Sequence, residues 1–146
     1  MGLPDRDTME RKLGFLNRYL TDLASYAALD DVGRHREHYA IERLLQLLCE
    51  SSADIALQFL KARGETLPAS YREIFWALEL HGDLPSSMAA DLVAACGMRN
   101  VLTHLYDIID LDRVIAAVEP ALDLYGAFLQ WALARATGAA PAAGRD

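Results

Sequence analysis

The strongest constraint on the fold is an apolar pattern that recurs at alternating spacings of four and three in three long stretches. This spacing places an apolar stripe along one side of a helix, which is then buried against other helices. The stripes are Met9, Leu13, Leu16, Leu20, Leu23 and Ala27; Ile41, Leu45, Leu48, Ser52, Ile55 and Phe59; and Ile115, Val118, Leu122, Tyr125, Leu129 and Ala132. Only nine Gly and five Pro occur in 146 residues, which disfavours a β-sandwich or barrel. The pattern predicts an all-α protein, an antiparallel bundle of four to five helices.

Caps and breakers set the expected helix bounds. Residues 30–33 should end the first helix, Ser70 with Glu73 should cap the third, and Pro120 should bend or restart the last. We therefore expect helices over about residues 7–29, 34–63, 71–78, 84–104 and 111–136. The second helix has further apolar residues outside its stripe, so it is either central or shared with another subunit. Residues 1–137 should form the bundle and residues 138–146 a flexible tail.

Charge and cysteine content limit the classes of partner and the compartment. The net charge of −7 argues against capture of nucleic acid or of an anionic membrane by the whole surface, although a local basic pocket stays open. We expect neither DNA nor a membrane as a partner. Residues 33–63 are the basic exception, with five basic and four acidic side chains. Cys49 and Cys96 lie in apolar helical runs, and we expect them to be buried free thiols. The start of the chain has no apolar signal region and no stretch is long enough for a membrane span, so we expect a cytoplasmic protein.

Polar residues cluster in residues 99–106, within an otherwise apolar region. Asn100 and His104 are four residues apart and share one helical face, so the amide could fix the imidazole tautomer. Arg99 and His104 differ by about 140° on an ideal helix, so they converge only with a distortion or through a second copy of the chain. With Tyr106 they would make a phosphate-handling site. The alternative is structural: a paired arginine, a core histidine and a core tyrosine.

A second polar group consists of His35, His38 and Glu42. Their spacings of three and four place them on one helical face, as a metal site would need. No Cys or further His lies nearby in the sequence. We therefore expect a solvated face rather than a metal site.

The spacing from Arg99 through Asn100 and His104 to Tyr106 resembles the motif of the HepT-like family of HEPN domains. The resemblance continues in residues 39–46 and 53–56, which are similar to the family's second helix, and in residues 71–75, 84–85 and 107–114. It covers about residues 7–125 in all.

The resemblance implies a homodimeric HEPN bundle whose two motifs meet at the interface. It also implies that the protein is a metal-independent endoribonuclease that needs no cofactor. Arg99 and His104 would be catalytic and Asn100 supporting. It also implies the toxin of a type VII-like toxin–antitoxin system that cuts tRNA or mRNA. Its partner would be an MntA-type nucleotidyltransferase antitoxin, which would neutralise it by AMPylation of Tyr106. The alternative is a catalytically weak binding subunit that the nucleotidyltransferase docks onto and modifies.

Overall fold

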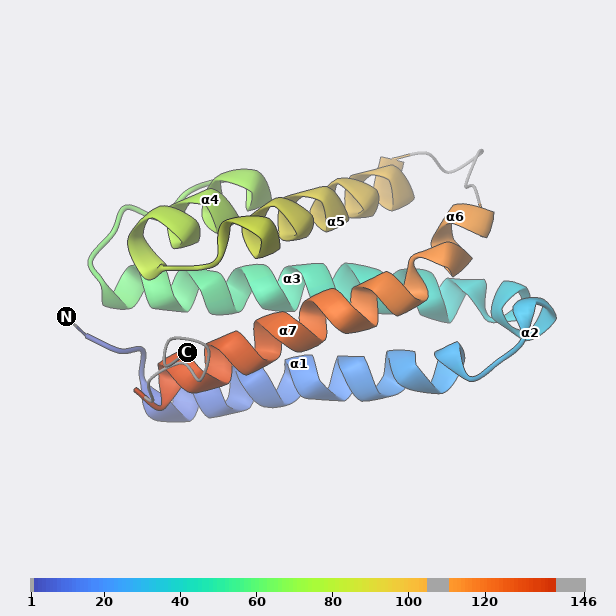
Figure 1. Cartoon of the computed structure of the whole chain (residues 1–146), viewed down its shortest axis with the longest axis horizontal. Coiled ribbons are helices and arrows are strands. Elements are labelled where there is room, and N and C mark those ends of the chain that lie inside the picture. The colour runs from blue at the N-terminus through green and yellow to red at the C-terminus, as the bar shows by residue number, and fades with distance from the viewer. Residues whose placement is uncertain (1, 105–110, 139–146) are drawn as a thin grey trace.

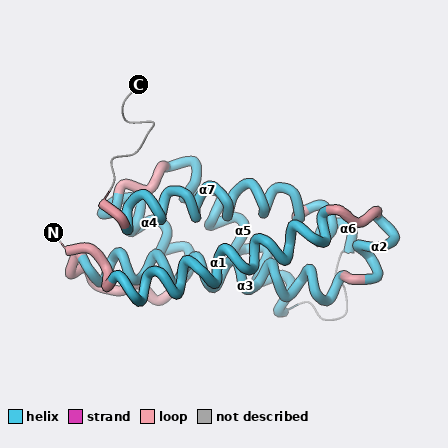
Figure 2. Tube along the Cα trace, turned by 90° about the horizontal axis from the view of Figure 1, so that it is seen from below, coloured by secondary structure: helices cyan, strands magenta, loops and turns pink. Residues whose placement is uncertain are grey.

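A computed structural model describes residues 2–104 and 111–138, and for residues 98–104 the helix alone. These residues form helices joined by turns, and no strand occurs among them (Figures 1 and 2). The helices are α1 (Arg6–Ala27), α2 (Asp31–Arg36), α3 (His38–Ala62), α4 (Tyr71–Gly82), α5 (Ser86–His104), α6 (Leu111–Ala116) and α7 (Val118–Ala136). The prediction of an all-α bundle with five main helices is confirmed; α2 and α6 are short additional helices.

Helix α3 is the central element of the bundle. It packs against α1, α4, α5, α6 and α7 (Figure 1). All six residues of its predicted apolar stripe are buried, and further buried residues extend around its circumference. The second apolar surface noted in the sequence is therefore explained within one chain, by a helix with neighbours on several sides.

Aromatic rings join α3, α4 and α7 at one end of the bundle. Phe128 of α7 packs edge-on against Phe75 of α4, with ring centroids 6.3 Å apart. Trp131 stacks on Phe128 at 5.8 Å and meets Phe59 of α3 edge-on at 5.3 Å. Such ring pairs stabilise a core by more than the burial of their area.

The predicted helix bounds are right for α1, α4 and α5 to within a few residues, but two long helices are divided. Asp30 does not end a helix; it caps one, because its carboxylate accepts a hydrogen bond from the Gly33 amide at 2.8 Å and α2 begins at once. Glu37 then separates α2 from α3, and Ala117 separates α6 from α7. Pro120 lies in the first turn of α7, where proline is tolerated, so its expected role as a restart is confirmed.

The predicted cap at Ser70 is confirmed. Ser70 caps α4, accepting from the Glu73 amide at 3.2 Å and donating to its carboxylate at 3.0 Å. Asp83, in the left-handed region at φ 62°, ends that helix. The connection at 107–110 and the tail beyond 138 lie outside the described residues. Among the helices that are described, none is both long and apolar enough to cross a bilayer.

Candidate functional site

The polar motif lies at the end of α5. Arg99, Asn100 and His104 occupy the last two turns of this helix, as the sequence predicts. Their side chains, and Tyr106 entirely, lie outside the described residues. The predicted convergence of the four therefore stays a prediction. The described residues show which elements hold this part of α5.

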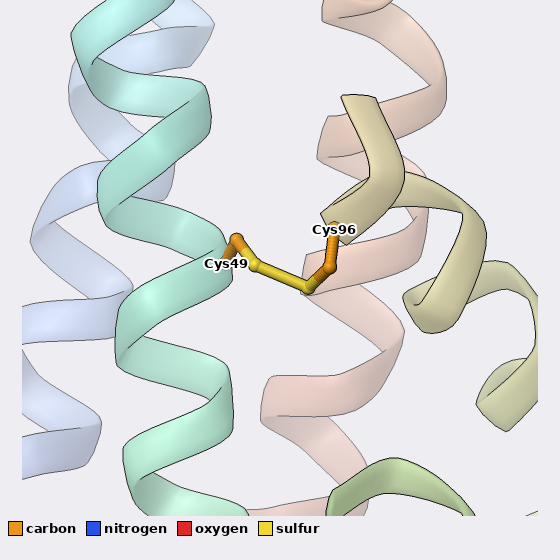
Figure 3. The surroundings of a disulfide bond; sticks show 2 residues. All are labelled: Cys49 and Cys96. Atoms are coloured by element: carbon orange, nitrogen blue, oxygen red, sulfur yellow. A yellow bond between two sulfur atoms is a disulfide. The ribbon is translucent and has the colours of Figure 1, made fainter. Parts of the chain in front are cut away.

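A disulfide between Cys49 and Cys96 links α3 to α5 one turn before the motif (Figure 3). The two Cα atoms are 5.8 Å apart, within the usual range for a bridged pair. The expectation of free thiols is wrong. The two cysteines are 47 residues apart in sequence, yet they lie opposite each other because α3 and α5 are neighbouring antiparallel helices (Figure 1).

The disulfide also identifies the side of α3 that faces α5. His38, Glu42, Leu45 and Cys49 are spaced by four, three and four, so they form one stripe along the helix. Leu45 and Ala94 of α5 line the same pocket, which agrees with this orientation. The stripe runs from the disulfide toward the N-terminus of α3, while α5 runs from the disulfide toward the motif. These two half-helices therefore lie alongside each other.

A buried carboxylate lies in this stripe. Glu42 is 7% exposed, and its carboxylate is 2.6 Å from Nδ1 of His38. The His38 ring in turn contacts the ring of Tyr39, with centroids 4.0 Å apart. The prediction of a solvated face is therefore wrong for Glu42. The seven-residue spacing from Glu42 to Cys49 does place the two on one face of α3. The sequence alone, however, does not show that this face turns toward another helix.

His35 does not join His38 and Glu42. Its Nδ1 lies 2.7 Å from the Asp31 carbonyl and its Nε2 lies 3.0 Å from the Asp112 carboxylate of α6. The hydrogen bond to the carbonyl, followed by that to Asp112, raises the pKa of His35. Among the residues that the structure describes, no three His, Cys, Asp or Glu side chains are grouped as a metal site would need.

Arg34 holds the same end of the bundle together. Its guanidinium donates to the Ala27 carbonyl at the end of α1, at 2.7 Å, and to the Glu119 carboxylate of α7. The hydrogen bond from Arg34 lowers the pKa of Glu119. Sequence reasoning missed this residue, because its acceptors come from segments more than 80 residues apart. The result is a fixed junction of α1, α2 and α7.

A pocket of about 480 Å³ lies where α3, α5, α6 and α7 meet. Its walls are mostly small or apolar, including Leu45, Ala94 and Pro120, and Asp91 and Arg113 supply its charges. It touches α5 at Asp91, Ala94 and Ala95, about one to two turns before the motif.

Comparison with known proteins decides the family. The protein-family model described as ribonuclease HepT-like matches residues 9–131 of this chain. The chain belongs to this family. The resemblance found in the sequence is thereby confirmed, and the matched region contains α2 to α6 completely and most of α1 and α7.

Two HepT-like nucleases and one solved structure are similar to this chain. The tRNA nuclease HepT of Aphanizomenon flos-aquae is 30% identical over 125 residues, which are 84% of this chain and 85% of that protein. The mRNA nuclease HepT of Shewanella oneidensis is 28% identical over 85 residues, 58% of this chain and 64% of that protein. The tri-AMPylated HEPN toxin of Shewanella oneidensis, solved in complex with MNT antitoxin, superposes with a TM-score of 0.75 at 22% identity, covering 85% of this chain and 95% of that one. The HEPN-type helical fold is therefore confirmed for this HepT-like chain.

Proposed function

We propose that this HepT-like chain is the toxin of a type VII-like toxin–antitoxin system and cleaves RNA in the cytoplasm. The observation that carries the proposal is the family match over residues 9–131, which includes Arg99 and His104 at the motif spacing. Two similar proteins act on tRNA and on mRNA, so either RNA is a reasonable substrate class.

The proposed active site lies between two copies of the chain. Arg99 and His104 are five residues apart, so on one regular helix they differ in direction by about 140°. Two copies related by a two-fold axis remove this difficulty, since the guanidinium of one and the imidazole of the other can face one groove. The protein would therefore act as a homodimer.

The proposed reaction uses the ribose 2′-hydroxyl as the nucleophile and needs no metal ion. His104 accepts the hydroxyl proton as the oxygen attacks phosphorus. Arg99 stabilises the negative charge that builds up on the phosphoryl oxygens. The bond to the 5′-oxygen breaks as that oxygen takes up a proton, leaving a 2′,3′-cyclic phosphate and a 5′-hydroxyl. Asn100 supports the site by orienting the imidazole.

Expression in cells tests this activity. The wild-type chain, produced without any antitoxin, should stop growth and leave broken RNA, whereas His104→Ala should do neither. The purified wild type should also cut RNA in excess EDTA and leave cyclic phosphate ends. Equal growth with both chains and intact RNA in both cultures would remove the proposal.

We also propose that an MntA-type nucleotidyltransferase is the antitoxin and that it attaches AMP to Tyr106. The support is the solved relative, which is a tri-AMPylated toxin bound to MNT antitoxin, together with the tyrosine at the matching spacing here. Each AMP would add a negative phosphate and a base to the groove that must admit RNA. If the chain lacks nuclease activity, modification by this partner would be its remaining role, as a binding subunit.

Intact mass measures the modification. Incubation with the nucleotidyltransferase and ATP should raise the mass of the chain in steps of one AMP and stop RNA cleavage. Tyr106→Phe should gain no mass, and Tyr26→Phe serves as the matched control because Tyr26 lies in α1. A mass gain that survives Tyr106→Phe would contradict the assignment of the modified residue.

A further inference from the structure

The first turns of α3 present an aromatic side chain that contributes little to the core of the monomer. Tyr39 is 77% exposed, the largest value among the exposed large hydrophobic residues of the described chain. A tyrosine ring held in water loses the benefit of burying its apolar faces. We propose that Tyr39, with Arg36 and Arg43, binds a nucleotide of the RNA next to the cleavage site. This inference rests on the proposed ribonuclease function.

The disulfide gives the position of this surface along the bundle. An α-helix rises 1.5 Å per residue, so His104 lies about 12 Å beyond Cys96. In the antiparallel neighbour α3, Arg43 lies about 9 Å and Tyr39 about 15 Å from Cys49 in the same direction. Because Cys49 and Cys96 are bonded, Arg43 and Tyr39 bracket the level of His104.

A buried carboxylate positions the tyrosine ring. Glu42 is held in the stripe that faces α5, and its hydrogen bond of 2.6 Å fixes the ring of His38. His38 packs against Tyr39 with ring centroids 4.0 Å apart. The two rings therefore pack side by side, with His38 on the α5 side of α3 and Tyr39 at the surface. A ring that is already ordered loses less conformational entropy when a base stacks on it.

Two exposed arginines lie near Tyr39 in the sequence, Arg36 at the end of α2 and Arg43 one turn further along α3. Within the described residues, Arg36 is exposed and has no hydrogen bond or ion pair. The exposed Arg43 side chain donates a long hydrogen bond, at 3.4 Å, to the amide oxygen of Gln46. Arg34, by contrast, is occupied by Glu119. One acid, Glu37, is exposed between Arg36 and Tyr39. Proteins that hold single-stranded RNA combine such cations with aromatic rings on which bases stack.

RNA binding by a chain that cannot cut provides the test. In the His104→Ala background, the dissociation constant for short, fluorescein-labelled single-stranded RNA is measured by anisotropy. Tyr39→Ala should weaken binding about tenfold, the usual loss of one stacked base, whereas Tyr39→Phe should stay within about twofold. Glu42→Gln should give an intermediate loss of RNA affinity, because the carboxylate that holds the His38 ring beside Tyr39 is replaced by a neutral amide. Arg36→Ala and Arg43→Ala should each lower the salt slope of log K by about 0.7.

Trp76→Ala is the matched control. Trp76 is also an exposed aromatic, at 48%, with Arg72 over its ring, but it lies on α4 at the other end of the bundle (Figure 1). This variant should bind RNA like its parent.

Equal affinities for Tyr39→Ala and its parent, or an equal loss in Trp76→Ala, would overturn the inference while leaving the ribonuclease function intact. A shift of Tyr39→Ala from dimer to monomer in light scattering would instead assign the ring to the subunit interface. If the wild type neither binds nor cuts RNA, the proposed function itself fails.

Discussion

Mixing two inactive variants, Arg99→Ala and His104→Ala, is expected to restore RNA cleavage. Each variant alone should lose about two to four orders of magnitude in rate, because one lacks the charge that stabilises the transition state and the other lacks the proton acceptor. A mixed dimer holds one intact guanidinium and one intact imidazole, on opposite chains. If the groove is shared, these two suffice, and the mixture should exceed either parent at least about tenfold.

Co-expression with two different affinity tags isolates the mixed dimer for this measurement. The control is the chain that carries both substitutions, paired with either single variant, which should stay inactive. A purified mixed dimer that is no more active than its parents would place Arg99 and His104 of one chain in the same groove. The composite site would then be wrong, although the ribonuclease function would stand.

Removing the disulfide is expected to have the largest effect on stability. The bridge closes a loop with a sequence separation of 47 residues. In the chain-entropy account, a loop of this length stabilises the folded state by about 4 kcal/mol, because the unfolded chain loses freedom. The double variant Cys49→Ala with Cys96→Ala should therefore unfold in urea at a clearly lower midpoint than the oxidised wild type.

Reductant separates the bond from the packing of the two side chains. Dithiothreitol should lower the urea midpoint of the wild type and leave that of the double alanine variant unchanged. Because Cys49 is fully buried and Cys96 is 3% exposed, reduction should be slow until the protein is partly unfolded. Identical midpoints with and without reductant, together with two alkylatable thiols in the native protein, would show that the bridge is absent in solution.

The sequence was sufficient to predict the bundle and most of its core. The spacing of four and three depends only on the helical repeat, so Leu16, Leu48 and Leu129 could be assigned to the interior without any knowledge of their neighbours. The cap at Ser70 was equally local, because its hydroxyl accepts from the amide of Glu73, three residues later. The position of Arg99 and His104 at the end of a helix followed from the same signals.

Most of the wrong predictions have a common physical cause: they depend on contacts between helices that are distant in the sequence. Cys49 and Cys96 pair because two helices distant in sequence are neighbours, and Glu42 is buried because its face of α3 turns toward α5. Asp30 was mistaken for a break because the same residue types end one helix and begin the next. The convergence of the motif side chains stays a prediction, since it depends on a second copy of the chain.

The placement of the start of α1 beside the end of α7 has a practical consequence for experiments. Leu3 and Pro4 line one pocket together with Ala136 and Thr137, so the start of α1 and the end of α7 are neighbours. They lie at the opposite end of the molecule from α2, α6 and the last turn of α5 (Figure 1). A fluorescent protein or a surface-immobilisation handle fused before α1 or after α7 should therefore leave RNA entry unobstructed. One short linker between Thr137 and Leu3 could join the two helices in a circular permutant.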